Sequence, residues 1–429
     1  MLSKQQASLA YRLLHQYSKC LIFHWYSNVE IVGQENIPYG NPCIIQPNHQ
    51  NALMDCVTLL GFYSQPILFF ARSDMFAKPW QANILHFFKI LPAYRQQEGW
   101  ENIKKNEDNF LLAKQWLKQG KSLCIMPEGG QDEKHRLRPF VKGPFRIALK
   151  TQQELDSPAH VYMLPVGIEH GDYNKAGFPL FINIGKPIDV RNYLQDYQQN
   201  NAIAINHIKD DTHQAVQSLM FNVVSSEHYE DFLIIAYLCE QQVVIKNKWK
   251  NTAGNRLKAR QYIADCLQNM EVTAMDMSLL LEQTKYLKND NINGLMMAKS
   301  IQNKPSKWMN LCFVSMTFVL YLLGGILNLP IWLIMYWIEK KLGKSGFAAT
   351  CKYVVWIVVA PIYQLLTASI VGICIQNILI FVALLLAMPL LSLFCVKYYT
   401  RLQLFVYQFG HSKHRKIALY IQQLMQNNL

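Results

Sequence analysis

The sequence predicts an α/β domain with a mostly parallel or mixed sheet flanked by helices, followed by a helical segment and C-terminal transmembrane helices. Three observations support this fold class. Short apolar runs alternate with helical patterns between residues 28 and 190. Polar helical patterns fill residues 191–307, and two long uncharged runs follow, from Met309 to Ile338 and from Tyr353 to Val396.

The alternating region is expected to form the sheet. Strands that alternate with helices are typical of parallel sheets, and strands that are apolar throughout fit burial on both faces. The expected helices include Asn51–Phe62, Asn102–Lys118 and Pro144–Gln152. The expected strands are Val29–Val32, Cys43–Gln46, Ile67–Ala71, Ile90–Tyr94, Ser122–Met126, Val161–Ile168 and Leu180–Ile184.

The N-terminal 27 residues are predicted to form a helix ahead of the 28–190 domain. The segment Leu9–Tyr26 is aromatic, mildly amphipathic and bears Arg12 and Lys19. Two placements fit this pattern: a position in a membrane interface, as basic aromatic helices adopt, or packing against the domain that follows. The polar helical patterns of 191–307 predict a helical appendage.

The two uncharged runs predict a membrane region over residues 308–396 and a basic tail over 397–429. A transmembrane helix needs about 20 apolar residues. The second run has 44 residues by its endpoints, enough for two spans joined by a turn at Gly372–Asn377. The first has 30 residues and is interrupted at Asn328–Pro330, so it is either one long span or a re-entrant hairpin. Basic residues flank both ends of each run, and the positive-inside rule then favours two hydrophobic hairpins with their ends and the α/β domain in the cytosol.

The formal net charge of +13 calls for an anionic partner. Basic residues beside apolar spans are suited to an anionic phospholipid membrane. The sequence has no zinc-finger, RNA-binding-sheet or interleaved basic and aromatic pattern, so nucleic acid is not expected as a partner. The ten cysteines are scattered without a CxxC pair, which predicts neither a disulfide framework nor a metal site.

A histidine and an aspartate follow the strand expected at Cys43–Gln46. His49 falls in the loop and Asp55 six positions later, at the start of the next helix. Asp55 would then hold one imidazole nitrogen and leave the other to take a proton, which is the logic of a base–carboxylate pair. On its own the pattern is weak, because a histidine at a strand end followed by an acid is common.

A second candidate stretch is the abrupt end of a buried strand in Pro127-Glu128-Gly129-Gly130. Glycine allows backbone to approach a ligand closely, and ligands of open α/β sheets bind beyond the carboxyl ends of strands. Guanidinium groups engage phosphate in a bidentate manner, so the basic residues that follow are suited to a phosphorylated ligand. The alternative is a solvated basic loop. These residues are Lys134, His135, Arg136, Arg138, Lys142 and Arg146.

Two further strands complete an ordered set. Ile90–Arg95 is a strand that ends in an arginine, and Met163–Gly167 carries Pro165 near its middle. A proline in a strand removes one ladder donor and predicts an edge or a bulge.

Together the four stretches resemble the four sequence blocks of the glycerophospholipid acyltransferase family, over residues 25 to 190. The blocks are NHQNALMD, ILPAYR, MPEGG and LPVGI. Five residues separate His49 from Asp55, where most members have four; five also occurs in a branch resembling fungal glycerol-3-phosphate and dihydroxyacetone-phosphate acyltransferases. Gly130 stands where the family commonly has serine.

The resemblance implies transfer of a fatty acyl group to a hydroxyl of glycerol-3-phosphate or 1-acylglycerol-3-phosphate in phospholipid biosynthesis. The co-substrate is an acyl thioester, acyl-CoA or acyl carrier protein, with no metal or other cofactor. His49 and Asp55 are the expected catalytic residues. The expected substrate-binding residues are Arg95, Glu128, Gly129, Arg136, Arg138 and Lys142.

Two alternatives stay open. One is a lysophospholipid-remodelling acyltransferase, and the other is a noncatalytic lipid-binding membrane protein on the same fold. A serine hydrolase is not expected, because the sequence has no Gly-x-Ser-x-Gly elbow. The predicted location is the membrane, multi-pass or hairpin-anchored, and the inner membrane if the protein is bacterial.

Overall fold

The computed structural model describes residues 9–94, 100–155, 158–269, 272–290, 292–302 and 306–428. Its contacts divide the chain into two compact units. The first unit comprises residues 1–23, 30–169 and 181–220, and the second comprises residues 24–29, 170–180 and 221–429. The domain boundaries expected from the sequence remain predictions; the division assigns residues 191–220 to the α/β unit.

The sheet confirms the predicted fold class. Its strand order is β1-β7-β6-β2-β5-β3-β4, and β8 pairs with β6. The pairs β2/β5, β2/β6, β3/β5 and β3/β4 are parallel, and β6/β8 is antiparallel, so the sheet is mixed. The strands are β1 (Val29–Val32), β2 (Cys43–Pro47), β3 (Ile67–Arg72), β4 (Ile90–Ala93), β5 (Ser122–Cys124), β6 (Tyr162–His170), β7 (Leu180–Ile184) and β8 (Ile188–Asp189).

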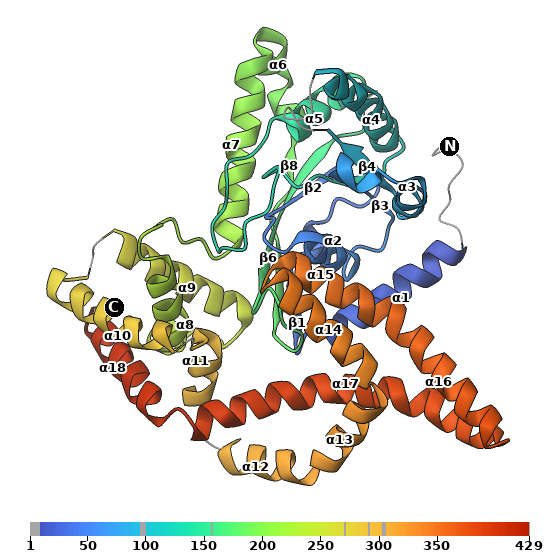
Figure 1. Ribbon diagram of the computed structural model, residues 1–429. Helices are drawn as coiled ribbons and strands as arrows, with labels where there is room; N and C mark the ends of the chain where they lie inside the picture. The colour runs from blue at the N-terminus through green and yellow to red at the C-terminus, as the bar shows by residue number, and fades with distance from the viewer. Residues whose placement is uncertain are drawn as a thin grey trace. The chain divides into compact units, whose positions relative to one another are not determined.

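Helices of the first unit pack on the sheet through one continuous apolar core. Ile44, Leu68, Leu123 and Met163 lie on four adjacent strands and share one face, because side chains alternate along each strand. Residues of α4, α5 and α7 pack against them. The helices of this region are α1 (Leu9–Trp25), α2 (Ala52–Leu60), α3 (Pro79–Phe87), α4 (Trp100–Lys118), α5 (Gly143–Gln153), α6 (Leu194–Gln199) and α7 (Asn201–Leu219), with the short turn η3 (Ser73–Phe76) between β3 and α3 (Figure 1).

The N-terminal helix α1 is apolar on two sides. Tyr11 and Ile22 are buried, while Leu9, Leu13 and Phe23 are 67%, 63% and 45% exposed. One side of this helix is therefore packed, as one of the two expected placements requires. The opposite side is an exposed apolar stripe, and its contact with a membrane stays a prediction.

The expectation that Pro165 marks an edge or a bulge is wrong. Pro165 lies inside β6, which has β7 on one side and β2 on the other. Its carbonyl accepts a hydrogen bond from the backbone N–H of Gly185, one residue beyond the end of β7. The missing donor of the proline therefore falls where that ladder ends, and no interior hydrogen bond is lost.

The second unit is helical. Helices α8 to α11 lie in the part of the predicted helical appendage, residues 191–307, that belongs to this unit, and α12 to α18 follow. Their bounds are α8 (Tyr229–Lys246), α9 (Ala253–Gln268), α10 (Ala274–Asn289), α11 (Gly294–Gln302), α12 (Ser306–Met316), α13 (Phe318–Leu327), α14 (Leu329–Leu342), α15 (Gly346–Val354), α16 (Ala360–Cys374), α17 (Ile378–Phe409) and α18 (Ser412–Asn428), with a π-helical turn at Val355–Val359 joining α15 to α16.

Two helices of this unit are long and apolar enough to cross a membrane. They are the continuous helix Gly346–Cys374 and α17, which run side by side as a hairpin (Figure 1). The turn between them lies within the predicted Gly372–Asn377. The first uncharged run is broken at Thr317, with a bend of 51°, and again at Asn328. If the bent pair α12–α13 counts as one span, the described residues hold up to three.

A buried asparagine holds the break at Asn328 against the hairpin. Its side-chain amide donates to the carbonyl of Met388 on α17 at 3.3 Å, and its oxygen accepts from the Gln364 amide on α16 at 2.9 Å. Interhelical hydrogen bonds of this kind join helices where apolar surroundings provide no other polar partner. The break is therefore a packed corner. The apolar helices are consistent with membrane association by their length and composition, and the number of crossings and their orientation stay predictions.

Candidate active site

The first block places its histidine and aspartate in direct contact. His49 lies in the loop after β2, and Asp55 lies in the first turn of α2, as the sequence predicts. The Nδ1 atom of His49 is 2.9 Å from Oδ2 of Asp55. The same oxygen accepts the backbone N–H groups of Gln50 at 2.9 Å and Asn51 at 2.8 Å. A carboxylate only accepts, so Nδ1 carries the proton and Nε2 is the nitrogen available for proton transfer.

Burial strengthens this pair. The side chain of Asp55 is 1% exposed and that of His49 is 16% exposed. The electrostatic attraction between a carboxylate and an imidazolium is larger in such surroundings than in water. Asp55 is therefore placed to fix the imidazole and to stabilise it when it becomes protonated.

The five-residue spacer contains a strained backbone position. Ala52, the first residue of α2, has φ of +46°. The left-handed region costs a residue with a side chain about 1–2 kcal/mol. The three hydrogen bonds to Asp55 close the loop around this residue and hold it in that conformation.

Two buried amides that sequence reasoning missed anchor the histidine loop on both sides of β2. The Asn48 side chain donates to the carbonyl of Ile168 on β6 at 3.0 Å and accepts its N–H at 2.7 Å. The Gln46 side chain donates to the carbonyl of Ile125, just after β5, at 3.0 Å. These amides add side-chain hydrogen bonds at the carboxyl end of β2, and His49 follows Asn48 directly.

The third block meets the first through Glu128. This side chain is 3% exposed. One carboxylate oxygen accepts the backbone N–H of His49 at 2.6 Å, and the other accepts the backbone N–H of Arg138 at 3.1 Å. Burial raises the pKa of Glu128 to about 7, and the two backbone donors oppose that shift. Both oxygens thus contact backbone, so the carboxylate ties the third-block loop to the catalytic loop.

The glycines of the third block serve two different purposes. Gly129 has φ of +64°, a conformation that favours glycine. Gly130 leaves space for an arginine: a Cβ atom at this position would lie 2.8 Å from a terminal nitrogen of Arg138. The absence of the serine common in the family therefore makes room for the Arg138 guanidinium.

The other predicted basic residues follow in the same loop. Arg136 pairs with Asp132 at 3.2 Å and is half-buried. Lys142 is exposed and precedes the first turn of α5. The backbone N–H of Val141 donates to the carbonyl of Pro127 at 2.7 Å, which closes the loop that carries the two arginines.

Arg95 lies outside the described residues. The strand end that precedes it is held by α4: the Asn106 side chain exchanges two hydrogen bonds with the backbone of Tyr94, and the Asn109 side chain donates to the carbonyl of Pro92.

Strand order explains why distant blocks meet. β2 lies between β5 and β6, and all three run parallel. Their carboxyl ends therefore share one sheet edge, which is where open α/β sheets bind ligands. The first block follows β2, the third follows β5, and the fourth is β6 itself.

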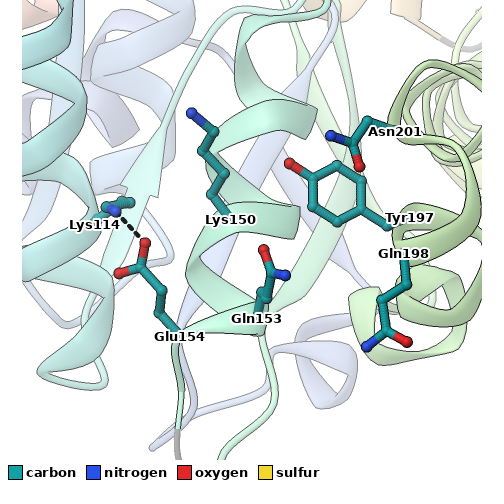
Figure 2. Close-up of a pocket in the computed structure, with 7 residues that line it drawn as sticks. All are labelled: Lys114, Lys150, Gln153, Glu154, Tyr197, Gln198 and Asn201. Atoms are coloured by element: carbon teal, nitrogen blue, oxygen red, sulfur yellow. Dashed lines mark hydrogen bonds and ion pairs between the residues drawn. The ribbon is translucent and has the colours of Figure 1, made fainter.

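A polar pocket of about 480 Å³ lies elsewhere in the first unit (Figure 2). Its lining residues include Lys150 and Glu154, at the far end of α5 from Lys142. The length of α5, about 1.5 Å per residue, separates the two ends by roughly 15 Å. No predicted site residue lines this pocket, so it is distinct from the candidate active site.

Comparison with known proteins agrees with the geometry. The family model described as Acyltransferase matches residues 28–169. Residues 28–169 carry this acyltransferase domain, and the curated relatives to which the chain is similar support the glycerophospholipid acyltransferase family. The chloroplastic 1-acyl-sn-glycerol-3-phosphate acyltransferase BAT2 of Brassica napus is 32% identical over 123 residues, which are 28% of this chain and 34% of that protein. The 1-acyl-sn-glycerol-3-phosphate acyltransferase of Borreliella burgdorferi is 25% identical over 183 residues, 42% of this chain and 70% of that protein.

The matches are confined to part of the chain. The aligned region spans about a third of the length of the Brassica relative. Among solved structures, that of the 1-acyl-sn-glycerophosphate acyltransferase PlsC from Thermotoga maritima is 21% identical and aligns over 51% of this chain and 84% of that chain, with a TM-score of 0.35. The likeness to the family therefore rests on the sequence matches.

Proposed function

We propose that this chain is a membrane-bound acyltransferase of phospholipid biosynthesis that transfers a fatty acyl group from a thioester to the free hydroxyl of 1-acylglycerol-3-phosphate. The observation that carries the proposal is the His49–Asp55 pair, buried at the sheet edge and fixed with Nε2 available. The names of the relatives favour the 1-acylated acceptor over glycerol-3-phosphate itself. Acyl-CoA and acyl carrier protein are both chemically suitable donors.

In the proposed reaction His49 acts as general base. A hydroxyl is a poor nucleophile, so Nε2 of His49 takes its proton as the oxygen attacks the thioester carbonyl carbon. The C–O bond forms, the C–S bond breaks, and the imidazolium returns its proton to the departing sulfur. Asp55 stabilises the transient imidazolium through Nδ1–H. General-base catalysis contributes about 10²- to 10⁴-fold in rate.

Glu128 acts in this scheme as a positioning residue. The sequence predicts it among the substrate-binding residues, and its contacts support a different role. Both oxygens accept backbone N–H groups, one of them from His49 itself. A carboxylate so engaged holds the base relative to the phosphate-binding loop.

The acceptor phosphate is proposed to bind the basic residues of the second and third blocks. Arg138 is held against Gly130, and Arg136 and Lys142 extend the same loop. Arg95 is proposed to supply a further guanidinium. Bidentate arginine contacts discriminate a phosphate from a neutral headgroup. Gly129, in its left-handed conformation, allows the loop backbone to approach the ligand.

The apolar helices are proposed to form two hairpins with their ends in the cytosol, where they keep the enzyme on the leaflet that holds its lipid acceptor and product. The flanking lysines and arginines support this orientation, because basic residues are retained on the cytoplasmic side.

An acceptor panel tests the proposal. Purified protein would be supplied with labelled acyl-CoA or acyl carrier protein and, separately, glycerol-3-phosphate, dihydroxyacetone phosphate, 1-acylglycerol-3-phosphate or lysophosphatidylcholine. Product chiefly from 1-acylglycerol-3-phosphate is expected. Preference for lysophosphatidylcholine would identify a remodelling enzyme instead. No transfer with any pair of substrates would favour a noncatalytic lipid-binding protein.

A further inference from the structure

The helix α3 buries none of its nine residues. Trp80, Ile84 and Phe87 are 60%, 49% and 44% exposed and recur at the four- and three-residue spacings of one helix face. Phe88, directly after the helix, is 38% exposed, and Met75 in the preceding turn η3 is 48% exposed. The segment is thus apolar in composition, and much of its apolar surface is exposed, while the Phe87 ring also meets Tyr11 of α1 edge-on, with ring centroids 6.5 Å apart.

A helix of this length needs a surface to pack against. Isolated helices shorter than about 12 residues are marginal in water. The helix α2 has the same number of residues and buries four of them, Met54, Asp55, Thr58 and Leu59. The contrast between the two helices indicates that the outer face of α3 is covered by something other than the core of its own unit.

Charge and chemistry favour a lipid interface as the surface that contacts the outer face of α3. The exposed Lys78 precedes α3, and Arg72 pairs with Asp74 at the start of η3. Trp80 stands near this polar end, while Ile84 and Phe87 lie beyond it. A tryptophan beside a basic residue, with aliphatic and aromatic side chains on the same face, is typical of helices that lie in the headgroup region of a bilayer. The chain also carries two helices suited to span a membrane, so a bilayer is available to it.

The segment begins at the edge of the sheet that holds the candidate active site. β3 runs parallel to β5, which is parallel to β2, so the carboxyl ends of all three lie on one edge. η3 begins directly after β3, and His49 follows β2. A lipid surface bound by η3 and α3 would therefore lie near the edge at which an acyl acceptor is used.

We propose that η3 and α3 form a lipid-docking surface of the α/β unit, with Trp80, Ile84 and Phe87 inserted into the interface of an anionic phospholipid bilayer. This inference goes beyond the proposed function, because it assigns membrane contact to the α/β unit in addition to the apolar helices. It stands whichever acceptor the enzyme uses.

Photo-crosslinking of the full-length protein tests the proposal. The photoreactive residue p-benzoylphenylalanine would replace Ile84 in one variant and Ile203 in another. Ile203 lies on α7 of the same unit and is 47% exposed, against 49% for Ile84, so it is a matched control. Both proteins would be reconstituted in vesicles of phosphatidylethanolamine and phosphatidylglycerol and irradiated. Their intact masses would then be measured by mass spectrometry.

The expected result is a mass increase of one phospholipid at position 84 and no lipid adduct at position 203. Three results would overturn the proposal: equal labelling at both positions, a crosslink from position 84 to another segment of the same chain, or a crosslink to a second copy. Because the adduct is read without turnover, loss or absence of acyl transfer does not affect the result. A failed acceptor panel and a failed docking test are therefore distinguishable.

Discussion

Replacement of Asp55 by asparagine isolates the charge of the carboxylate at the candidate base. An asparagine oxygen in the place of Oδ2 can accept the backbone N–H groups of Gln50 and Asn51 as the carboxylate does. The third partner is Nδ1 of His49, 2.9 Å away. The variant removes the negative charge beside the imidazolium that forms during proton transfer.

The magnitude follows from the separation and burial of the pair. With the charge centres about 4 Å apart and an effective dielectric constant of about 20, the attraction is about 4 kcal/mol. Each 1.36 kcal/mol of transition-state stabilisation is a tenfold change in rate, so kcat is expected to fall about 10³-fold. KM for the acceptor is expected to change little, because Asp55 is buried and holds His49 and the adjoining loop.

Steady-state acyl transfer measured with Asp55→Asn checks this estimate. Asp210→Asn is the matched control, since Asp210 lies on α7 of the same unit and its side chain is 60% exposed in an ion pair with Lys209. The control is expected to retain full activity. Circular dichroism of both variants reports retention of the fold. A loss of less than about tenfold in kcat for a folded Asp55→Asn would refute the base–carboxylate reasoning.

Three further changes test the surroundings of the base. Asn48→Ala leaves the buried backbone N–H and carbonyl of Ile168 without their side-chain partner, so it is expected to lower the free energy of unfolding by about 2–4 kcal/mol and to lower kcat more than it changes KM. Thermal denaturation and steady-state kinetics measure the two effects. An unchanged melting temperature would contradict the role of Asn48 in anchoring the histidine loop. Burial raises the pKa of Glu128 to about 7 from its ordinary value of 4.5, so the free energy of unfolding is expected to fall as pH rises between these values. Glu128→Gln should remove that slope from the melting temperatures, and a slope that persists would exclude Glu128 as its source. Gly130→Ser would displace the Arg138 guanidinium, so KM for a phosphorylated acceptor is expected to rise with little change in kcat, and an unaltered KM would remove Arg138 from phosphate binding.

Much of the α/β unit follows from local sequence pattern. The apolar runs at Val29–Val32 and Leu180–Ile184 form strands with the predicted bounds, and the others agree within two residues. The His49–Asp55 contact was also predictable, because a strand end and a helix start position the two residues regardless of the rest of the fold. Such features depend on a few neighbouring residues.

The features that the sequence did not indicate depend on contacts between distant segments. The sequence alone does not distinguish Asn48 and Gln46 from ordinary polar residues. Their anchoring contacts are seen only when β5 and β6 lie on either side of β2. Pro165 suggested an edge or a bulge, and only the end of β7 at Ile184 shows why it is tolerated in the interior. Glu128 accepts the backbone N–H of His49 although 79 residues separate the two in the sequence, and the sheet brings their loops together.

The apolar pattern of α3 was likewise ambiguous. A short run containing Trp80 and Phe87 is equally consistent with a buried helix, and only the observed exposure distinguishes the two. The separate roles of Gly129 and Gly130 also became distinct with the backbone angle of one and the arginine beside the other.

The most direct test of the account is acyl transfer to 1-acylglycerol-3-phosphate by His49→Ala, compared with His207→Ala. The His207 side chain is 58% exposed on α7 and is the control for loss of a histidine. The account predicts product from the His207 variant at the unmodified rate and a loss of about 10²- to 10⁴-fold in the His49 variant, the range expected for removal of a general base. Undiminished transfer by a folded His49→Ala protein would contradict the central claim that His49 takes the acceptor's proton.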